Sequence, residues 1–190
     1  IRIVWYNSTM LIKEHTNPKR TGLRDLFSTL LKGDKMANKK VRVVAVSDLH
    51  INSTIGICPP VTQLDDGGTY FPSKAQRVLW DSWIDFSKKA FDTKDPVYVI
   101  INGDIVEADC GKSFQFISRN PSTIHDMAMS VLHPLVKKAQ KVFVVRGTEY
   151  HVGKSGGAEE AIAKDLDNIV YYDKDANIAS YWLLRTIIAG

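Results

Sequence analysis

The chain has 190 residues, of which 44% are hydrophobic and 24% are charged, and its formal net charge is +4. This length and composition allow a sizeable core and predict a single domain. Every apolar stretch is shorter than the roughly 18 residues that a membrane span requires, so we expect no membrane partner. The two cysteines, Cys58 and Cys110, lack metal-ligand spacing, which indicates free thiols and a reducing, cytoplasmic location.

The positive charge is concentrated at the start of the chain. Residues 1–40 contain nine Lys or Arg and three Asp or Glu, whereas residues 41–190 contain sixteen and eighteen. Because the larger part is slightly acidic, the basic pI does not indicate a nucleic-acid-binding domain. We interpret residues 1–40 as a basic leader or other non-domain segment, with a short amphipathic helix at 23–31, and residues 41–190 as the domain.

The first predicted element of the domain is a buried parallel strand at residues 41–46, followed directly by Asp48 and His50. The long segment at 51–72 contains paired prolines, aspartates and glycines. A loop of this length inside a compact domain is usually functional or disordered. Residues 73–91 then carry apolar side chains at helical spacing, and their first residue is a serine suited to capping a helix.

A second strand is predicted at residues 97–101, and Gly103 and Asp104 follow it. Glycine at this position allows the backbone to approach a metal ion closely, where a Cβ atom would crowd it. A helix at 122–140 comes next. Pro134 should kink or divide that helix, because proline lacks the N–H of a helical hydrogen bond.

A third strand, at residues 142–145, leads into the segment Gly-Thr-Glu-Tyr-His at 147–151. A helix is predicted at 158–166, and two apolar strand candidates follow at 169–172 and 178–188. Strands thus alternate with helices along the domain, as in α/β proteins with a largely parallel sheet.

Polar side chains therefore follow three parallel strands, and ligands in such sheets bind at the carboxyl ends. Carboxylate oxygens and imidazole nitrogens meeting there can hold divalent or trivalent ions of the Mn, Fe, Zn or Co class. We predict Asp48, His50 and Asp104 as metal ligands, with Asp104 bridging two ions. Two ions ~3.5–4 Å apart stabilise the attacking and leaving oxygens of a displacement at phosphorus. A hydroxide between the ions is the expected nucleophile.

These motifs resemble the signature of the calcineurin-like metallophosphoesterases: Asp-x-His, then Gly-Asp-x-x-Asp, then Gly-Asn-His-Asp/Glu, each after a strand. Asp48 and His50 match the first part. Gly103 and Asp104 match the second, with Glu107 where the family usually has Asp. The resemblance implies a layered mixed sheet flanked by helices, and a metal-dependent hydrolase acting on phosphomonoesters or phosphodiesters.

The third motif departs from the family pattern. Thr148 stands where the family has a metal-ligating Asn, and Glu149 stands where it has the His that helps to protonate the leaving group. An imidazole suits general-acid catalysis, so we predict His151 as the catalytic residue or a further ligand. Thr148, Glu149 and Arg146 are further candidates. Arg146 would contact phosphate, and a surface ion pair is the alternative.

The segments at 58–80 and 146–154 are similar to a metallophosphoesterase subgroup often met in phage and prophage sequences. The family's later histidine motifs are missing, because His151 is the last histidine of the chain. We therefore interpret the domain as incomplete at its C-terminus. Half a coordination shell should hold two ions weakly, so we expect weak metal binding and little turnover from these 190 residues.

Two alternatives remain open. One is a non-catalytic protein on the same fold, with a degenerate metal site that serves a partner. The other is a nucleotide-hydrolysing P-loop protein, because Gly147 and Gly153-Lys154-Ser155 lie between a strand and a helix. Five residues separate these glycines, where the P-loop pattern has four. The expected partner is a phosphate ester, with nucleic acids and nucleotides included, and the oligomeric state is not fixed by the sequence.

Overall fold

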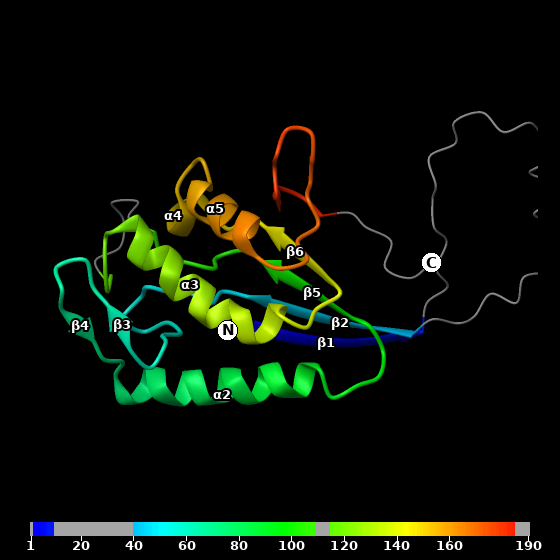
Figure 1. Cartoon of the computed structure of the whole chain (residues 1–190), viewed down its shortest axis with the longest axis horizontal. Coiled ribbons are helices and arrows are strands. Elements are labelled where there is room, and N and C mark those ends of the chain that lie inside the picture. The colour runs from blue at the N-terminus through cyan, green and yellow to red at the C-terminus, as the bar shows by residue number, and fades with distance from the viewer. Residues whose placement is uncertain (1, 10–39, 109–114, 185–190) are drawn as a thin grey trace, which may run out of the picture.

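The computed structural model describes residues 2–9, 40–108 and 115–184. The helix predicted at 23–31 and the second cysteine, Cys110, lie outside these residues. A five-stranded mixed sheet with helices packed on it forms the described part of the molecule (Figure 1). No helix within the described ranges is long and apolar enough to cross a membrane.

The sheet has the strand order β1-β2-β5-β6-β7. Its strands are β1 (Arg2–Thr9), β2 (Lys40–Ser47), β5 (Val97–Asn102), β6 (Lys141–Val145) and β7 (Ser180–Tyr181). β2, β5, β6 and β7 are parallel to their neighbours, and β1 is antiparallel to β2 at the edge. The strands predicted at 41–46, 97–101 and 142–145 are thereby confirmed.

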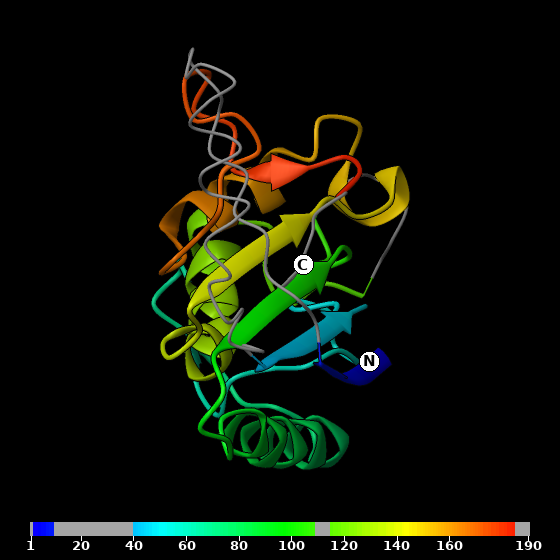
Figure 2. The ribbon, with the colours of Figure 1, turned by 90° about the vertical axis from the view of Figure 1, so that its right-hand side faces the viewer.

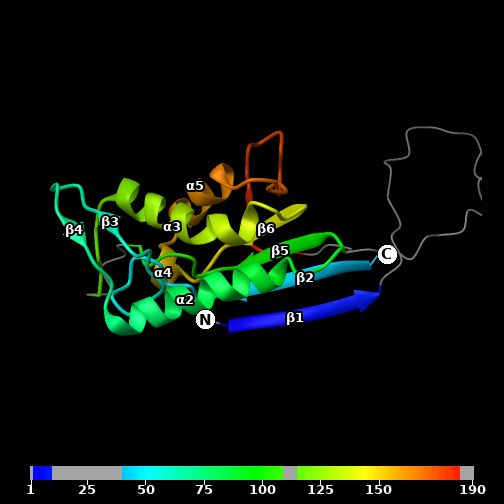
Figure 3. The same cartoon turned by 60° about the horizontal axis from the view of Figure 1, so that its bottom comes forward.

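The first strand changes the expected division of the chain. Arg2–Thr9, which we expected to lie in a leader outside the domain, pairs with β2 along its whole length. Figure 3 shows β1 beside β2, with helix α2 in the foreground. An edge strand presents a row of unpaired N–H and C=O groups that another strand can bind, and the backbone of β1 pairs with β2 in this way. Residues 10–39 of the predicted leader lie outside the described ranges.

Helices α2, α3 and α5 lie side by side along one face of the sheet (Figure 2). The helices are α2 (Lys74–Ala90), α3 (Pro121–Val136), α4 (Glu149–Val152) and α5 (Gly157–Asp165). The long loop after β2 contains a short antiparallel pair, β3 (Thr62–Gln63) and β4 (Thr69–Tyr70). Parallel strands joined through helices on one side are the expected result of crossover connections.

The helix boundaries follow from their capping residues. Ser73 caps α2 in a capping box with Gln76, as its sequence position predicted. Asn120 caps α3, and its Oδ1 accepts the Ser122 N–H at 2.9 Å. α3 ends at residue 136 rather than 140, and Pro134 lies in its last turn, where it lacks the N–H that would donate to the Ser130 carbonyl.

After β6, the predicted helix is present but the two predicted strands differ from the prediction. The helix predicted at 158–166 is present as α5. Of the two strand candidates, the one at 178–188 contributes the two residues of β7, and its end lies outside the described ranges. At 169–172 the described backbone forms only an isolated bridge between Ile169 and Val142.

The core lies between the sheet and the three helices. Strand registers place Val44 beside Val99 and Val99 beside Val142, and the three are buried. On the helix side, Trp83 of α2 is buried and its Nε1 donates to the Val131 carbonyl of α3 at 2.7 Å. This packing fixes the strands relative to one another, and so fixes the three loops that leave their carboxyl ends.

Candidate metal centre

The loops after β2 and β5 continue the hydrogen bonding of the sheet. The Asp48 N–H donates to the Gly103 carbonyl at 3.2 Å, and the His50 N–H donates to the Asp104 carbonyl at 3.1 Å. These bonds place the first two predicted motifs against each other at the carboxyl edge of the sheet, where ligand sites in α/β proteins lie.

All three predicted metal ligands have a left-handed backbone. The φ angles are 57° for Asp48, 47° for His50 and 51° for Asp104. Non-glycine residues adopt this conformation at a cost of roughly 1–3 kcal/mol, and such residues cluster at functional sites. The backbone is thus bent at each point where a predicted ligand leaves the sheet.

The predicted ligands come together in space. Asp48, His50 and Asp104 offer ligand atoms that all lie within 4.8 Å of one another, and His50, Glu107 and His151 form a second such group. The side chains of His50 and His151 are about a quarter exposed, so the cluster is open to solvent on one side. His50 belongs to both groups and joins them.

Glu107 links the two histidines. Its Oε2 lies 2.8 Å from His151 Nδ1 and 3.3 Å from His50 Nδ1, and the two rings are edge-to-face with centroids 4.4 Å apart. A carboxylate at a histidine Nδ1 fixes the orientation of the ring and leaves Nε2 for a metal or a proton. The sequence marks Glu107 only as a departure from the family motif. Its spacing, three residues after Asp104, was the signal that could have identified it.

The third motif is placed differently from the first two. Thr148 donates to Asp104 Oδ1 through its N–H at 2.7 Å and its hydroxyl at 3.2 Å, so it contacts a predicted ligand. Glu149 is exposed at the first position of α4 and belongs to neither ligand group. The short helix α4 brings His151 back toward Glu107.

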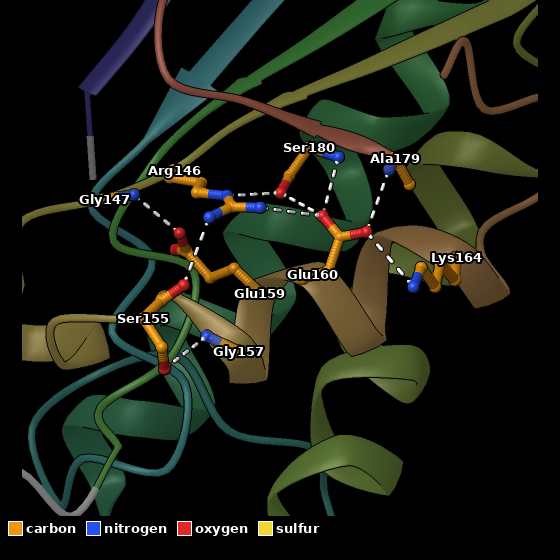
Figure 4. Close-up of polar contacts among 9 residues, drawn as sticks. All are labelled: Arg146, Gly147, Ser155, Gly157, Glu159, Glu160, Lys164, Ala179 and Ser180. Atoms are coloured by element: carbon orange, nitrogen blue, oxygen red, sulfur yellow. Dashed lines mark hydrogen bonds and ion pairs between the residues drawn. The ribbon is translucent and has the colours of Figure 1, made fainter. Parts of the chain in front are cut away.

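The guanidinium of Arg146 makes its contacts with other residues of the protein. Its guanidinium lies 3.3 Å from Glu160 Oε2, donates to Ser180 Oγ at 2.7 Å and to the Ser155 carbonyl at 3.1 Å (Figure 4), and stacks over the Trp182 ring. The structure therefore shows the ion-pair alternative for Arg146. The pair is partly buried, with side chains 12% and 16% exposed, rather than on the open surface.

A second glutamate, Glu159, is fully buried behind the cluster. Its Oε1 accepts the Ile105 N–H at 2.8 Å and its Oε2 accepts the Gly147 N–H at 2.6 Å. Burial raises the pKa of Glu159 to about 7, and the nearby Asp104 charge adds to the shift, against the opposing effect of the two N–H bonds. No sequence signal pointed to Glu159, because its position on α5 reads as an ordinary helical residue.

The donor set suits a metal ion. It consists of carboxylate oxygens and imidazole nitrogens, the ligands of Mn, Fe and Zn sites. Among the described residues, Glu107 Oε1 is buried without a hydrogen-bond partner, and an unpaired buried carboxylate oxygen is costly unless a cation or donor meets it. Both observations favour a cation at this cluster.

Comparison of the chain with models of known protein families, with curated proteins and with solved structures gives no match. The class of the protein therefore rests on its own fold and site. It is a mixed α/β protein with a largely parallel sheet flanked by helices. At the carboxyl edge of that sheet it carries a cluster of Asp, Glu and His side chains that can hold metal.

Proposed function

We propose that the protein is a metal-dependent phosphoesterase, built on a calcineurin-like layered sheet and using two divalent or trivalent ions. The observation that carries the proposal is the meeting of the motifs after β2, β5 and β6 in one cluster, with ligand atoms within 4.8 Å of one another in each group. Phosphomonoesters and phosphodiesters, including nucleotides and nucleic acid, are the proposed substrates.

Each residue has a role that follows from its contacts. Asp48, His50 and Asp104 would hold the ions, and Thr148 orients the Asp104 carboxylate through two hydrogen bonds. When bound, the ions supply positive charge at phosphorus and an activated water as nucleophile. His151, oriented by Glu107, would give its proton to the leaving oxygen.

The P-loop alternative is disfavoured by the same geometry. A P-loop offers backbone N–H groups to phosphate at the N-terminus of a helix. Here the Gly147 N–H already donates to the Glu159 carboxylate, so it is not available to a phosphate. Lys154 is exposed, and Gly156, with a φ of 58°, separates it from the start of α5.

Metal-dependent turnover tests the proposal. The chain is stripped of metal with a chelator and reloaded with Mn²⁺, and hydrolysis of p-nitrophenyl phosphate and bis-p-nitrophenyl phosphate is followed. We expect slow hydrolysis that requires Mn²⁺. His151→Asn should lower kcat by about 100-fold or more, because a general acid contributes roughly 10²–10⁴-fold.

The matched control is His133→Asn, since His133 is exposed on α3 and should leave the rate unchanged. If His151→Asn keeps its Mn²⁺ affinity, His151 acts as the general acid. If the variant loses that affinity, His151 is a metal ligand. Mn²⁺ binding without hydrolysis of either ester would favour the non-catalytic alternative. Hydrolysis that is indifferent to metal would refute the proposal.

A further inference from the structure

The peptide group between Asp104 and Ile105 is held from two sides. Its carbonyl oxygen accepts the His50 N–H at 3.1 Å, and its N–H donates to Glu159 Oε1 at 2.8 Å. Because a peptide group is planar, these two bonds fix its orientation. They thereby help to impose the left-handed backbone of Asp104, a conformation that persists only where its surroundings require it.

The other oxygen of the same carboxylate holds the neighbouring loop. Glu159 Oε2 accepts the Gly147 N–H at 2.6 Å, a contact that Figure 4 shows. The loops after β5 and β6 are in close contact at this point. A Cβ added to Gly147 would lie 2.3 Å from both the nitrogen and Oδ1 of Asp104. No side chain fits between them. Their spacing is therefore set by Glu159 and by the hydrogen bonds from Thr148 to Asp104.

Glu159 acts outside the ligand cluster. It has no exposed surface, and it belongs to neither group of ligand atoms. Its neighbour on α5, Glu160, makes comparable bonds elsewhere: its carboxylate accepts the N–H groups of Ala179 and Ser180, each at 2.9 Å, where β7 begins. Two consecutive glutamates thus tie one helix to different parts of the sheet, and only the first binds backbone N–H groups of the metal loops, whereas Glu160 meets the Arg146 side chain.

We propose that Glu159 is a positioning residue of the metal centre, a buried carboxylate that holds the loops after β5 and β6 at the spacing in which Asp104 binds metal. This inference rests on the metal site of the proposed function. Glu159 touches neither metal nor substrate, and its effect reaches the site through the backbone of Ile105 and Gly147.

The variant Glu159→Gln tests the inference, because the amide has nearly the same shape and only one of its two polar atoms can accept a hydrogen bond. Either the Ile105 or the Gly147 N–H then loses its acceptor. We expect the Mn²⁺ affinity of the metal-stripped chain, measured by isothermal titration calorimetry, to fall about tenfold or more. In the metal-free protein, hydrogen exchange at one or both of these amides should accelerate.

The control is Glu160→Gln, which removes a charge from the next residue of the same helix. It should lower the melting temperature yet keep the Mn²⁺ affinity within about twofold, since Glu160 reaches the loop after β6 only through the Arg146 side chain and bonds to neither the Ile105 nor the Gly147 N–H. If the amides of Glu159→Gln exchange faster but its Mn²⁺ affinity is unchanged, the positioning role is refuted and the proposed function is not. Absence of Mn²⁺ binding in the wild-type chain would overturn the proposed function, and this inference with it.

Discussion

Three buried or half-buried glutamates have different structural roles in this molecule. Glu107 orients two histidines, Glu159 holds two backbone loops, and Glu160 binds Arg146 and the start of β7. Their surroundings differ accordingly. For Glu160, burial by itself would raise the pKa, but hydrogen bonds from Ser180 and from the Ala179 N–H outweigh it and lower the pKa from 4.5 to about 2.

The lowered pKa of Glu160 predicts a pH-dependent stability. A carboxylate whose pKa is lower in the folded than in the unfolded chain stabilises the fold above its unfolded pKa, and this contribution is lost as the pH falls through the folded value. Glu160→Gln should therefore lower the unfolding free energy by about 1.5–3 kcal/mol at pH 6. The difference from wild type should shrink between pH 4.5 and about 2.

Urea denaturation at pH 6, 4 and 3 measures this difference. Asp85→Asn serves as control, because the Asp85 side chain is 70% exposed beside Lys88 and exposed pairs contribute little. A wild-type-to-variant difference that stays constant down to pH 3 would show that Glu160 is not stabilised in its charged form.

At the scale of elements, α2 and α3 hold the sheet in place. The structure places the aromatic residues Trp83 and Phe86 of α2 in the core, where they are 2% and 8% exposed. Gln76, also buried, binds the Ser53 and Gly56 carbonyls of the loop after His50. α2 therefore supports both the sheet and the loop that follows the first ligand motif.

Removal of the central α2 side chain should be costly. Trp83→Ala leaves a cavity between α2 and α3 and removes the Nε1 donor from the Val131 carbonyl, so we expect a loss of about 3–5 kcal/mol in unfolding free energy. Trp80→Ala, at a half-buried position of the same helix, is the control and should lose clearly less. Equal losses of unfolding free energy, measured by urea denaturation, would mean that the two tryptophans contribute equally to the packing.

On the scale of the whole molecule, the two faces of the sheet differ. Val44, Val99 and Val142 are buried under the helices, whereas Ala45 and Ile100, which pair across β2 and β5, are half-buried. The described residues supply the helical layer on one face, and the layered sandwich stays part of the proposed function.

Metal binding should stabilise the whole molecule, because a ligand that binds only the folded state adds its binding free energy to folding. At a Mn²⁺ concentration 100 times the dissociation constant, the gain is about 2.7 kcal/mol. For a chain of this length that corresponds to roughly 5–10 °C in melting temperature.

Differential scanning calorimetry with Mn²⁺ and with excess chelator measures the shift. Asp104→Asn is the matched comparison, since it keeps the size of the side chain and removes a ligand charge. An equal shift in wild type and variant would place the bound ion elsewhere on the protein.

The sequence by itself determined the strands that carry the motifs and the convergence of their ends. Apolar runs at 41–46, 97–101 and 142–145 specify buried parallel strands, and such strands align their carboxyl ends, so Asp48, His50 and Asp104 had to meet. Tertiary structure alone decided which other side chains reach that edge. Glu107 and Glu159 lie there because of a loop turn and a helix packed against the sheet. β1 joins the sheet through long-range backbone pairing, which local periodicity does not encode.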